Sequence, residues 1–277
     1  MNESAIDPDA FDAFEAAGWE ERAEGYDRFL GSITSRLIEP LLDAASVGPG
    51  TRVLDVATGP GYVAGRAADR GARVTGVDVA AAMVALAARS HPGIEFREAD
   101  AQALPFEDES FDAVLANFLI LHLGRPEQAA GEFARVLAPG GKVALTAWDL
   151  PDRARIIGVF LDAIAEAGAI PPQDIPKGPD FFRFARGEEL DALLAEHGLE
   201  DRQVDTIAFT HRVSTADELW DGLLAGAVRT SALIERQPDA TRRRIREAFD
   251  RLVVEHRQGD ALELPVSAKL AAGRKPG

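Results

Sequence analysis

The stretch Thr51-Arg-Val-Leu-Asp-Val-Ala-Thr-Gly-Pro-Gly61 joins a short apolar run to a glycine-rich turn. The run predicts a buried strand over 51–56, because a few apolar residues bounded by turn signals are typical of parallel sheets. The residues after the turn predict a helix that ends near Gly71. A strand, a glycine turn and a helix in this order are typical of a site for a nucleotide cofactor, since glycine lets a ligand approach the backbone closely.

Strands and helices alternate on both sides of this stretch. Further strands are expected over 73–77, 94–96, 111–121, 142–148, 204–213 and 262–270. Helices are expected over 29–45, 80–90, 126–138, 154–167, 188–197 and 241–257. Ser214-Thr-Ala-Asp217 resembles a capping box, with Asp in place of Glu, ahead of one more helix. The alternation predicts an α/β fold with a doubly wound parallel sheet.

Composition excludes several classes of protein. The 277 residues contain no cysteine, which rules out disulfides, thiolate metal sites, iron–sulfur clusters and a cysteine nucleophile. The formal net charge of −16 would repel a nucleic acid. The chain has no apolar stretch near the ~20 residues of a membrane span, and its acidic N-terminus lacks a signal pattern. We therefore expect a cytoplasmic protein with a small-molecule substrate and neither a nucleic-acid nor a membrane partner.

Three acids near the predicted strand ends indicate what the turn binds. Asp55 would oppose a pyrophosphate and favour a ligand with an ammonium group, such as S-adenosylmethionine, although it could instead only brace the turn. Asp78 suits both hydroxyls of a ribose, with a helix cap as its alternative. Asp100 can reach an adenine amino group, unless it is a solvated loop acid. An NAD site predicts glycine at position 64 and no acid at 55, whereas the chain has Ala64.

Five segments occur in a recognisable order: Val53–Gly61, Gly76–Asp78, Ala99–Ala101, Phe111–Val114 and Leu137–Gly141. Together they resemble the motif series of class I S-adenosylmethionine-dependent methyltransferases, and most of all the small-molecule and quinone-methylating, UbiE-like (methyltransferase type 11) branch. The resemblance covers roughly residues 45–148. It implies a Rossmann-like seven-stranded sheet with an antiparallel last strand, placed here at 262–270, and helical cap segments.

The resemblance also implies a division of the chain. The expected parts are an N-terminal helical cap (1–45), a cofactor-binding core (46–150), a cap insertion (151–186), a core continuation (187–213), a helical cap insertion (214–258), and a final core strand with a tail (259–277).

Cofactor-binding residues follow from the same resemblance. Asp55, Ala57, Gly59 and Gly61 would contact the methionine part, Asp78 the ribose, Val79, Met83, Asp100 and Ala101 the adenine, Asn117 the region of the methyl group, and Tyr26 the outer side of the cofactor. The usual first glycine of the motif is Ala57 here, and alanine is tolerated in this branch. No metal site is expected.

Catalytic and substrate residues are less marked in the sequence. His122 follows the fourth core strand and is the candidate general base, although we favour a packing role for it. Trp19, Phe181, Phe182 and Trp220 could form an aromatic site for a hydrophobic acceptor, with core packing as the alternative.

These observations predict an S-adenosylmethionine-dependent methyltransferase that moves a methyl group by direct displacement to a small organic acceptor, with S-adenosylhomocysteine as the other product. The acceptor would be a specialised metabolite or a quinone-like compound. The alternative is a protein of this fold that binds the cofactor without methylating, as a cyclase, a decarboxylase or a scaffold. The sequence indicates neither the acceptor atom nor the oligomeric state.

Overall fold

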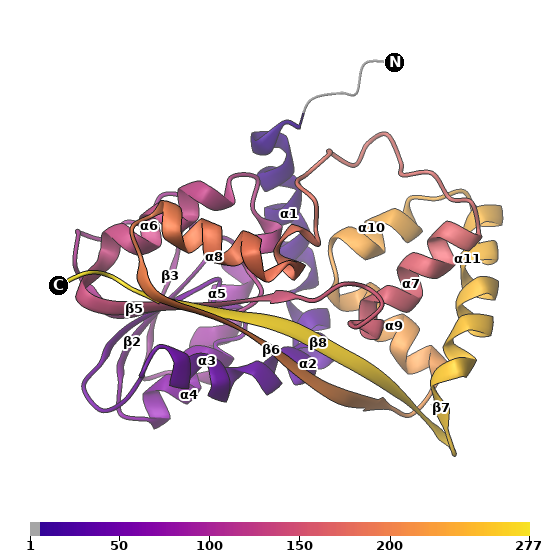
Figure 1. Cartoon of the computed structure of the whole chain (residues 1–277). Coiled ribbons are helices and arrows are strands. Elements are labelled where there is room, and N and C mark those ends of the chain that lie inside the picture. Colours follow the sequence, from indigo (N-terminus) through magenta and orange to yellow (C-terminus); the bar gives the residue numbers. More distant parts are fainter. Residues whose placement is uncertain (1–5) are drawn as a thin grey trace.

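One mixed sheet organises the chain, of which the computed structural model describes residues 6–277 (Figure 1). Its strands are β1 (Arg52–Val56), β2 (Arg73–Asp78), β3 (Glu95–Glu98), β4 (Phe111–Ala116), β5 (Leu137–Trp148), β6 (Glu200–Val213), β7 (Arg257–Gln258) and β8 (Ala261–Arg274). The strand order is β3-β2-β1-β4-β5-β8-β6, and β7 pairs with β8 outside this path. The first five strands are parallel, and β8 runs antiparallel to both β5 and β6. The doubly wound sheet with an antiparallel last strand is thus confirmed.

Several strand limits differ from those expected. The two-residue strand β7 adds an eighth strand to the seven expected. Strand β4 ends at Ala116, because the next residues form a 3₁₀ turn, η2 (Ile120–His122). Strand β5 starts at Leu137 and runs through the glycines before Lys142, pairing with β4 across a register shift.

Helices cover both faces of the sheet and continue beyond one end of it. The helices are α1 (Pro8–Arg28), α2 (Leu30–Thr34), α3 (Ile38–Ala44), α4 (Tyr62–Asp69), α5 (Ala81–Ser90), α6 (Pro126–Val136), α7 (Arg155–Glu166), α8 (Gly187–Glu196), α9 (Ala216–Gly226), α10 (Arg229–Glu235) and α11 (Asp239–Leu252), with 3₁₀ turns η1 (Ser35–Leu37), η3 (Arg183–Ala185) and η4 (Val253–His256). In Figure 1, α6 and α8 lie on one side of the sheet and α3 and α4 on the other. Helices α7, α9, α10 and α11 form a separate group at the far end, with α1 between them and the sheet.

Helix starts follow from local sequence. Helix α1 begins after Asp7, whose side chain accepts a hydrogen bond from the Ala10 N–H at 3.1 Å. The expected capping box at the start of α9 is shifted by one residue. Thr215 is the cap and accepts from the Glu218 N–H at 3.0 Å, while the Glu218 carboxylate accepts from the Ser214 N–H at 2.9 Å. Glu218, rather than Asp217, therefore supplies the carboxylate.

The strand order reverses between β1 and β4, because β2 and β3 lie on one side of β1 and the later strands on the other. In open α/β sheets a reversal of this kind leaves a crevice at the carboxyl ends of the strands. Helix α1 covers this crevice and packs closely on α9: a Cβ added at Gly25 would lie 2.1 Å from the Ala225 carbonyl oxygen. The fold thus encloses a pocket between the sheet, α1 and the far helices.

Candidate functional site

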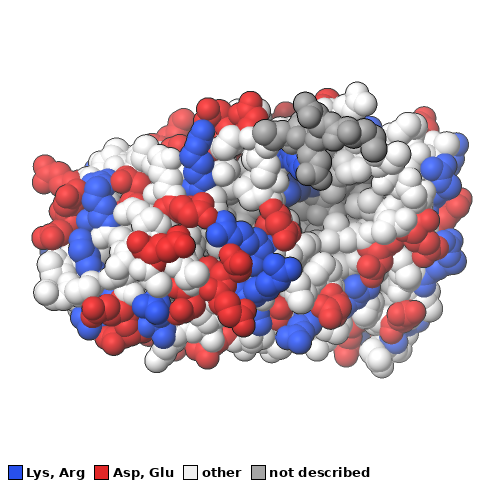
Figure 2. Space-filling model, turned by 45° about the horizontal axis from the view of Figure 1, so that its top comes forward, with Lys and Arg blue, Asp and Glu red and all other residues white. Residues whose placement is uncertain are grey.

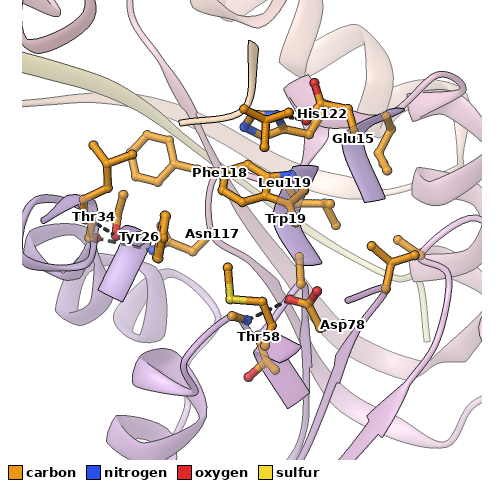
Figure 3. A pocket seen from close by; sticks show the side chains of 18 of the residues that line it. Glu15, Trp19, Tyr26, Thr34, Thr58, Asp78, Asn117, Phe118, Leu119 and His122 are labelled. Atoms are coloured by element: carbon orange, nitrogen blue, oxygen red, sulfur yellow. Dashed lines mark hydrogen bonds and ion pairs between the residues drawn. The ribbon is translucent and has the colours of Figure 1, made fainter. Parts of the chain in front are cut away.

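The pocket lies at the carboxyl ends of β1, β2 and β4, and residues from α1, α2, β5, α7, α9 and α10 complete its wall. Figure 3 shows Asp78 at one end, His122 and Glu15 at the other, and Trp19 between them. The pocket therefore brings together residues from both the core and the helical cap.

The glycine-rich turn forms the floor of the pocket with left-handed backbone. Gly59 and Gly61 have φ of 54° and 85°, and Ala57 has φ of 55°. A side chain at Gly61 would be strained and would meet the His91 ring at 2.8 Å. Ala57, Thr58 and Gly59 line the pocket, whereas Gly61 caps α4 beside it. The absent first glycine of the motif thus leaves an alanine in a conformation that suits glycine.

Asp55 is fully buried and supports the turn from within. Its Oδ2 accepts hydrogen bonds from the Thr58 hydroxyl at 2.6 Å and the Ala64 N–H at 3.0 Å. Thr58, but not Asp55, is among the residues that line the pocket. These are the bracing contacts that the sequence left open as the alternative for Asp55. Burial raises the pKa of this carboxyl to about 7.

Asp78 reaches the pocket from the end of β2. Its Oδ2 accepts from the Gly59 N–H at 2.9 Å, and its Oδ1 accepts from the Ala80 N–H at 3.0 Å. Both oxygens keep a lone pair, so the carboxylate can also accept from a pair of neighbouring hydroxyls. Burial raises its pKa to about 6. The side chain of Val79 is 43% exposed beside it, and Met83 also lines the pocket, so an apolar surface adjoins the acid.

Asp100 and Ala101 line the same end of the pocket, after β3. The Oδ1 of Asp100 accepts from the Gln102 N–H at 2.8 Å, which fixes the loop. Gln102 then donates through Nε2 to Asp12 of α1 at 3.0 Å. Asp100 therefore lines the same pocket as Asp78, and the hydrogen bond from Gln102 to Asp12 links its loop to α1.

Asn117 and Tyr26 are held by hydrogen bonds in the middle of the pocket wall. The Asn117 amide accepts from the Thr146 hydroxyl at 2.7 Å and donates to the Thr34 carbonyl at 3.3 Å. The Tyr26 hydroxyl lies 2.8 Å from the Thr34 hydroxyl, and burial raises its pKa to about 12. Phe118 follows with φ of 58°, a strained conformation for a non-glycine residue. The end of β4 is thus set rigidly next to α2.

His122 faces α1 at the other end of the pocket. Its Nδ1 lies 3.0 Å from Oε2 of Glu15, whose side chain is 4% exposed. The rings of Trp19 and Phe181 meet the imidazole edge-on, at 5.0 and 5.7 Å between centroids. The packing role that we favoured for His122 is therefore present, together with a buried carboxylate that orients the ring.

The four expected aromatic substrate residues separate into two groups. Trp19 and Phe181 line the pocket. Phe182 instead packs against Phe181, 4.9 Å between ring centroids, on the side away from the lining. Trp220 needs correction: its ring stacks on Phe160 at 5.6 Å and contacts Phe249 at 5.0 Å inside the hydrophobic core. Trp220 thus contacts α7 and α11 and is a core residue.

Sequence reasoning missed three charged residues of the pocket, Asp12, Glu15 and Arg229. They lie in α1 and at the start of α10, and none belongs to a recognisable motif. Acidic and basic residues alternate with apolar ones throughout α1, so the sequence carries no signal that marks Glu15 as buried.

Comparisons with known proteins agree with the geometry. Residues 54–145 match the family described as "Methyltransferase domain". A demethylmenaquinone methyltransferase of Renibacterium salmoninarum is 40% identical over 118 residues, which cover 43% of this chain and 50% of that protein. The chain spans about half the length of this curated relative. Residues 54–145 include the glycine-rich turn and the acids Asp55, Asp78 and Asp100. Residues 54–145 of this chain thus resemble a class I methyltransferase domain of the UbiE-like type.

Solved structures resemble this chain over more than the matched segment, and this likeness concerns the fold alone. The [4+2]-cyclase SpnF is 24% identical, with a TM-score of 0.51 over 88% of this chain and 81% of that one. A phosphoethanolamine N-methyltransferase of Haemonchus contortus, solved with phosphomonomethylethanolamine and S-adenosylhomocysteine, is 19% identical, with a TM-score of 0.52 over 87% of this chain and 53% of that one.

Residues 6–277 contain no group of three or more His, Cys, Asp or Glu side chains arranged to hold a metal ion. Within the same range, no helix is both long and apolar enough to span a membrane.

Proposed function

We propose that the protein is an S-adenosylmethionine-dependent methyltransferase that acts on a small, apolar organic acceptor, either a quinone-like compound or a specialised metabolite. The observation that carries this proposal is the charge of the pocket. Four acids line it, Asp12, Glu15, Asp78 and Asp100, against one arginine, Arg229. S-adenosylmethionine presents a sulfonium and an ammonium to this wall, whereas NAD would present two phosphates.

The end of the pocket near the turn has a donor set that suits this cofactor. Asp78 offers two oxygens for ribose hydroxyls, Val79 and Met83 offer an apolar face for adenine, and Asp100 offers an acceptor for its amino group. Arg229 Nε lies 4.0 Å from Glu15 Oε1, at the other end of the pocket, so no cation among the described lining residues could pair with a pyrophosphate near the turn. A dehydrogenase is therefore disfavoured.

The acceptor end supports an apolar substrate. Trp19, Phe118, Trp148, Ile157 and Leu223 line it. The cofactor supplies an activated methyl group, so the protein contributes alignment and the exclusion of water, and alignment is worth up to ~7–11 kcal/mol in favourable cases. On the face shown in Figure 2, basic and acidic side chains are interspersed rather than gathered into a basic area, which fits a small-molecule acceptor better than a nucleic acid.

A second function is favoured by one comparison. The fold of the [4+2]-cyclase SpnF aligns with 88% of this chain. The same scaffold therefore supports a reaction of another class. In that case the pocket would bind the cofactor, and the aromatic end would only shape a reacting polyene or ring.

The two functions are separated by following the methyl group. The protein is incubated with S-adenosylmethionine labelled on the methyl carbon and with reduced naphthoquinones, and the organic phase is counted. We expect label in an organic product, and its loss in Asp78→Ala. If the cofactor binds but no label leaves the aqueous phase with any acceptor, methyl transfer is contradicted and the second function is favoured.

A further inference from the structure

A polar cluster lies in the otherwise apolar end of the pocket. It consists of Glu15 from α1, His122 after β4 and Arg229 at the start of α10. Glu15 Oε2 lies 3.0 Å from His122 Nδ1, and Glu15 Oε1 lies 4.0 Å from Arg229 Nε. The Arg229 guanidinium also lies over the rings of Phe11 and Phe181, at 5.2 and 5.1 Å. Three distant segments of the chain thus converge on one point.

The cluster contains hydrogen-bonding atoms that the protein does not satisfy. Glu15 Oε1 and Arg229 Nη1 are buried, and neither has a hydrogen-bond partner among the described residues. An unsatisfied buried polar atom costs about 1–3 kcal/mol, and more when it is charged. Burial also lowers the pKa of the Arg229 guanidinium. Groups of this kind inside a cavity indicate a ligand that supplies the missing contacts.

The histidine is oriented for proton transfer. With Nδ1 bound to the Glu15 carboxylate, the neutral ring carries its proton on Nδ1 and leaves Nε2 as an acceptor. The charged groups that line the pocket with it at this end are Glu15 and Asp12 on α1 and Arg229 on α10, and Asp180 also acts electrostatically on Arg229. Asp12 is already engaged by the Gly124 N–H at 2.6 Å and by Gln102. An imidazolium at position 122 would therefore be balanced by Glu15.

We propose that this cluster binds and deprotonates a planar phenol or enol, an inference that rests on the function proposed above. The acceptor's hydroxyl donates to His122 Nε2, and an adjacent oxygen of the acceptor accepts from Arg229 Nη1. His122 is the catalytic base, Glu15 is a positioning residue that acts through it, and Arg229 is a binding residue that sets specificity.

The hydroxyl proton passes to Nε2, and the electron pair left on oxygen forms a bond to the methyl carbon, either from the oxygen itself or from the ring carbon conjugated with it. The carbon–sulfur bond breaks, and its electron pair stays on sulfur. Transfer to oxygen gives a methyl ether. Transfer to carbon is followed by loss of that carbon's proton to solvent.

The test uses 2-nitrophenol, whose ionised form absorbs visible light and whose nitro group places an oxygen next to the hydroxyl. The full-length protein is first saturated with S-adenosylhomocysteine, and binding of that ligand is measured separately. The nitrophenol is then titrated at a fixed pH below its own pKa in solution. We expect the ratio of ionised to neutral nitrophenol to be at least tenfold higher when bound than when free, because His122 Nε2 accepts the proton and the resulting imidazolium favours the anion.

Variants assign this effect to residues. In His122→Gln the bound nitrophenol should return to the ratio seen in solution while still binding, and Glu15→Gln should give an intermediate ratio. Arg229→Met should weaken binding about tenfold or more, the loss expected for one hydrogen bond to a charged group. Arg236→Met is the matched control, because Arg236 also lies over a ring, that of Phe14, outside the pocket. His122→Asn replaces His122→Gln if the latter does not fold.

The proposal is overturned if the bound nitrophenol keeps its solution ratio in the unmodified protein, if His122→Gln leaves a raised ratio unchanged, or if 2-nitroanisole, which has no proton to give, binds as tightly. It is also overturned if the nitrophenol does not bind while S-adenosylhomocysteine does. Failure of S-adenosylhomocysteine itself to bind would contradict the proposed function instead, so the two failures are distinguishable.

Discussion

Replacing Asp55 with asparagine should change the free energy of unfolding by an amount that depends on pH. The difference between the variant and the unmodified protein should favour the variant more at pH 8 than at pH 5. Both hydrogen bonds to this side chain end on the same oxygen, Oδ2, so the amide oxygen of asparagine can accept both. The substitution therefore keeps the bracing of the turn and removes only the ability to ionise.

The magnitude follows from the two pKa values of Asp55. The carboxyl has an ordinary value of 3.8 when unfolded and about 7 in the folded protein. Below 3.8 the group is protonated in both states, and it costs nothing. As the pH rises from 3.8 to about 7, the unfolded chain releases the proton of Asp55 and the folded chain keeps it. The free energy of unfolding therefore falls, by about 4 kcal/mol in all. Between pH 5 and pH 8, Asp55→Asn should therefore gain about 3 kcal/mol relative to the unmodified protein.

The assay is urea unfolding of both proteins at pH 5 and pH 8, with Asp152→Asn as the control. Asp152 is exposed, so its substitution should change stability equally at the two pH values. A difference between Asp55→Asn and the unmodified protein that does not change with pH would refute the reasoning. It would mean that Asp55 stays ionised in the folded protein despite its burial.

Three further substitutions test other parts of the structure. Ala57→Gly should raise stability by about 0.5–1 kcal/mol in thermal unfolding, because it relieves a left-handed alanine, and Ala103→Gly should not. Trp220→Leu should lower the free energy of unfolding in urea by about 3 kcal/mol or more, because the contacts with Phe160 and Phe249 are lost, and it should leave the cofactor affinity measured by calorimetry unchanged. A loss of affinity without a loss of stability would instead place Trp220 in the pocket. Gly25→Ala should cost about 1–3 kcal/mol, since its Cβ would meet a carbonyl of α9, whereas Gly48→Ala, with open space around it, should have no effect.

The core of the fold could be predicted because its signals are local. Strand β1, the glycine turn and the acid at the end of β2 lie within residues 52–78, and each is marked by apolar runs, glycine or a lone carboxylate. The strand order then follows from the family resemblance. The limits of β4 and β5 were less accurate, because a 3₁₀ turn and a register shift depend on pairing with distant residues.

The substrate end of the site could not be predicted in the same way, because it is built from segments far apart in the chain. Glu15 and Arg229 meet across 214 positions, and no local pattern links them. Trp220 and Phe181 look alike in the sequence, but one turns into the core and the other into the pocket. Aromatic side chains both fill cores and line pockets, so the residue type alone does not separate these two fates.

The proposed function requires that the acidic end of the pocket bind a cationic adenosyl cofactor through Asp78. Calorimetric titration with S-adenosylmethionine, S-adenosylhomocysteine and NAD, on the unmodified protein and on Asp78→Ala, measures whether it does. We expect both adenosyl ligands to bind and NAD not to. Affinity should fall at least a hundredfold in Asp78→Ala, since two hydrogen bonds to a charged group are lost, at about 1.5–3 kcal/mol each. Binding of NAD alone, or binding of S-adenosylmethionine that Asp78→Ala leaves unchanged, would contradict the claim.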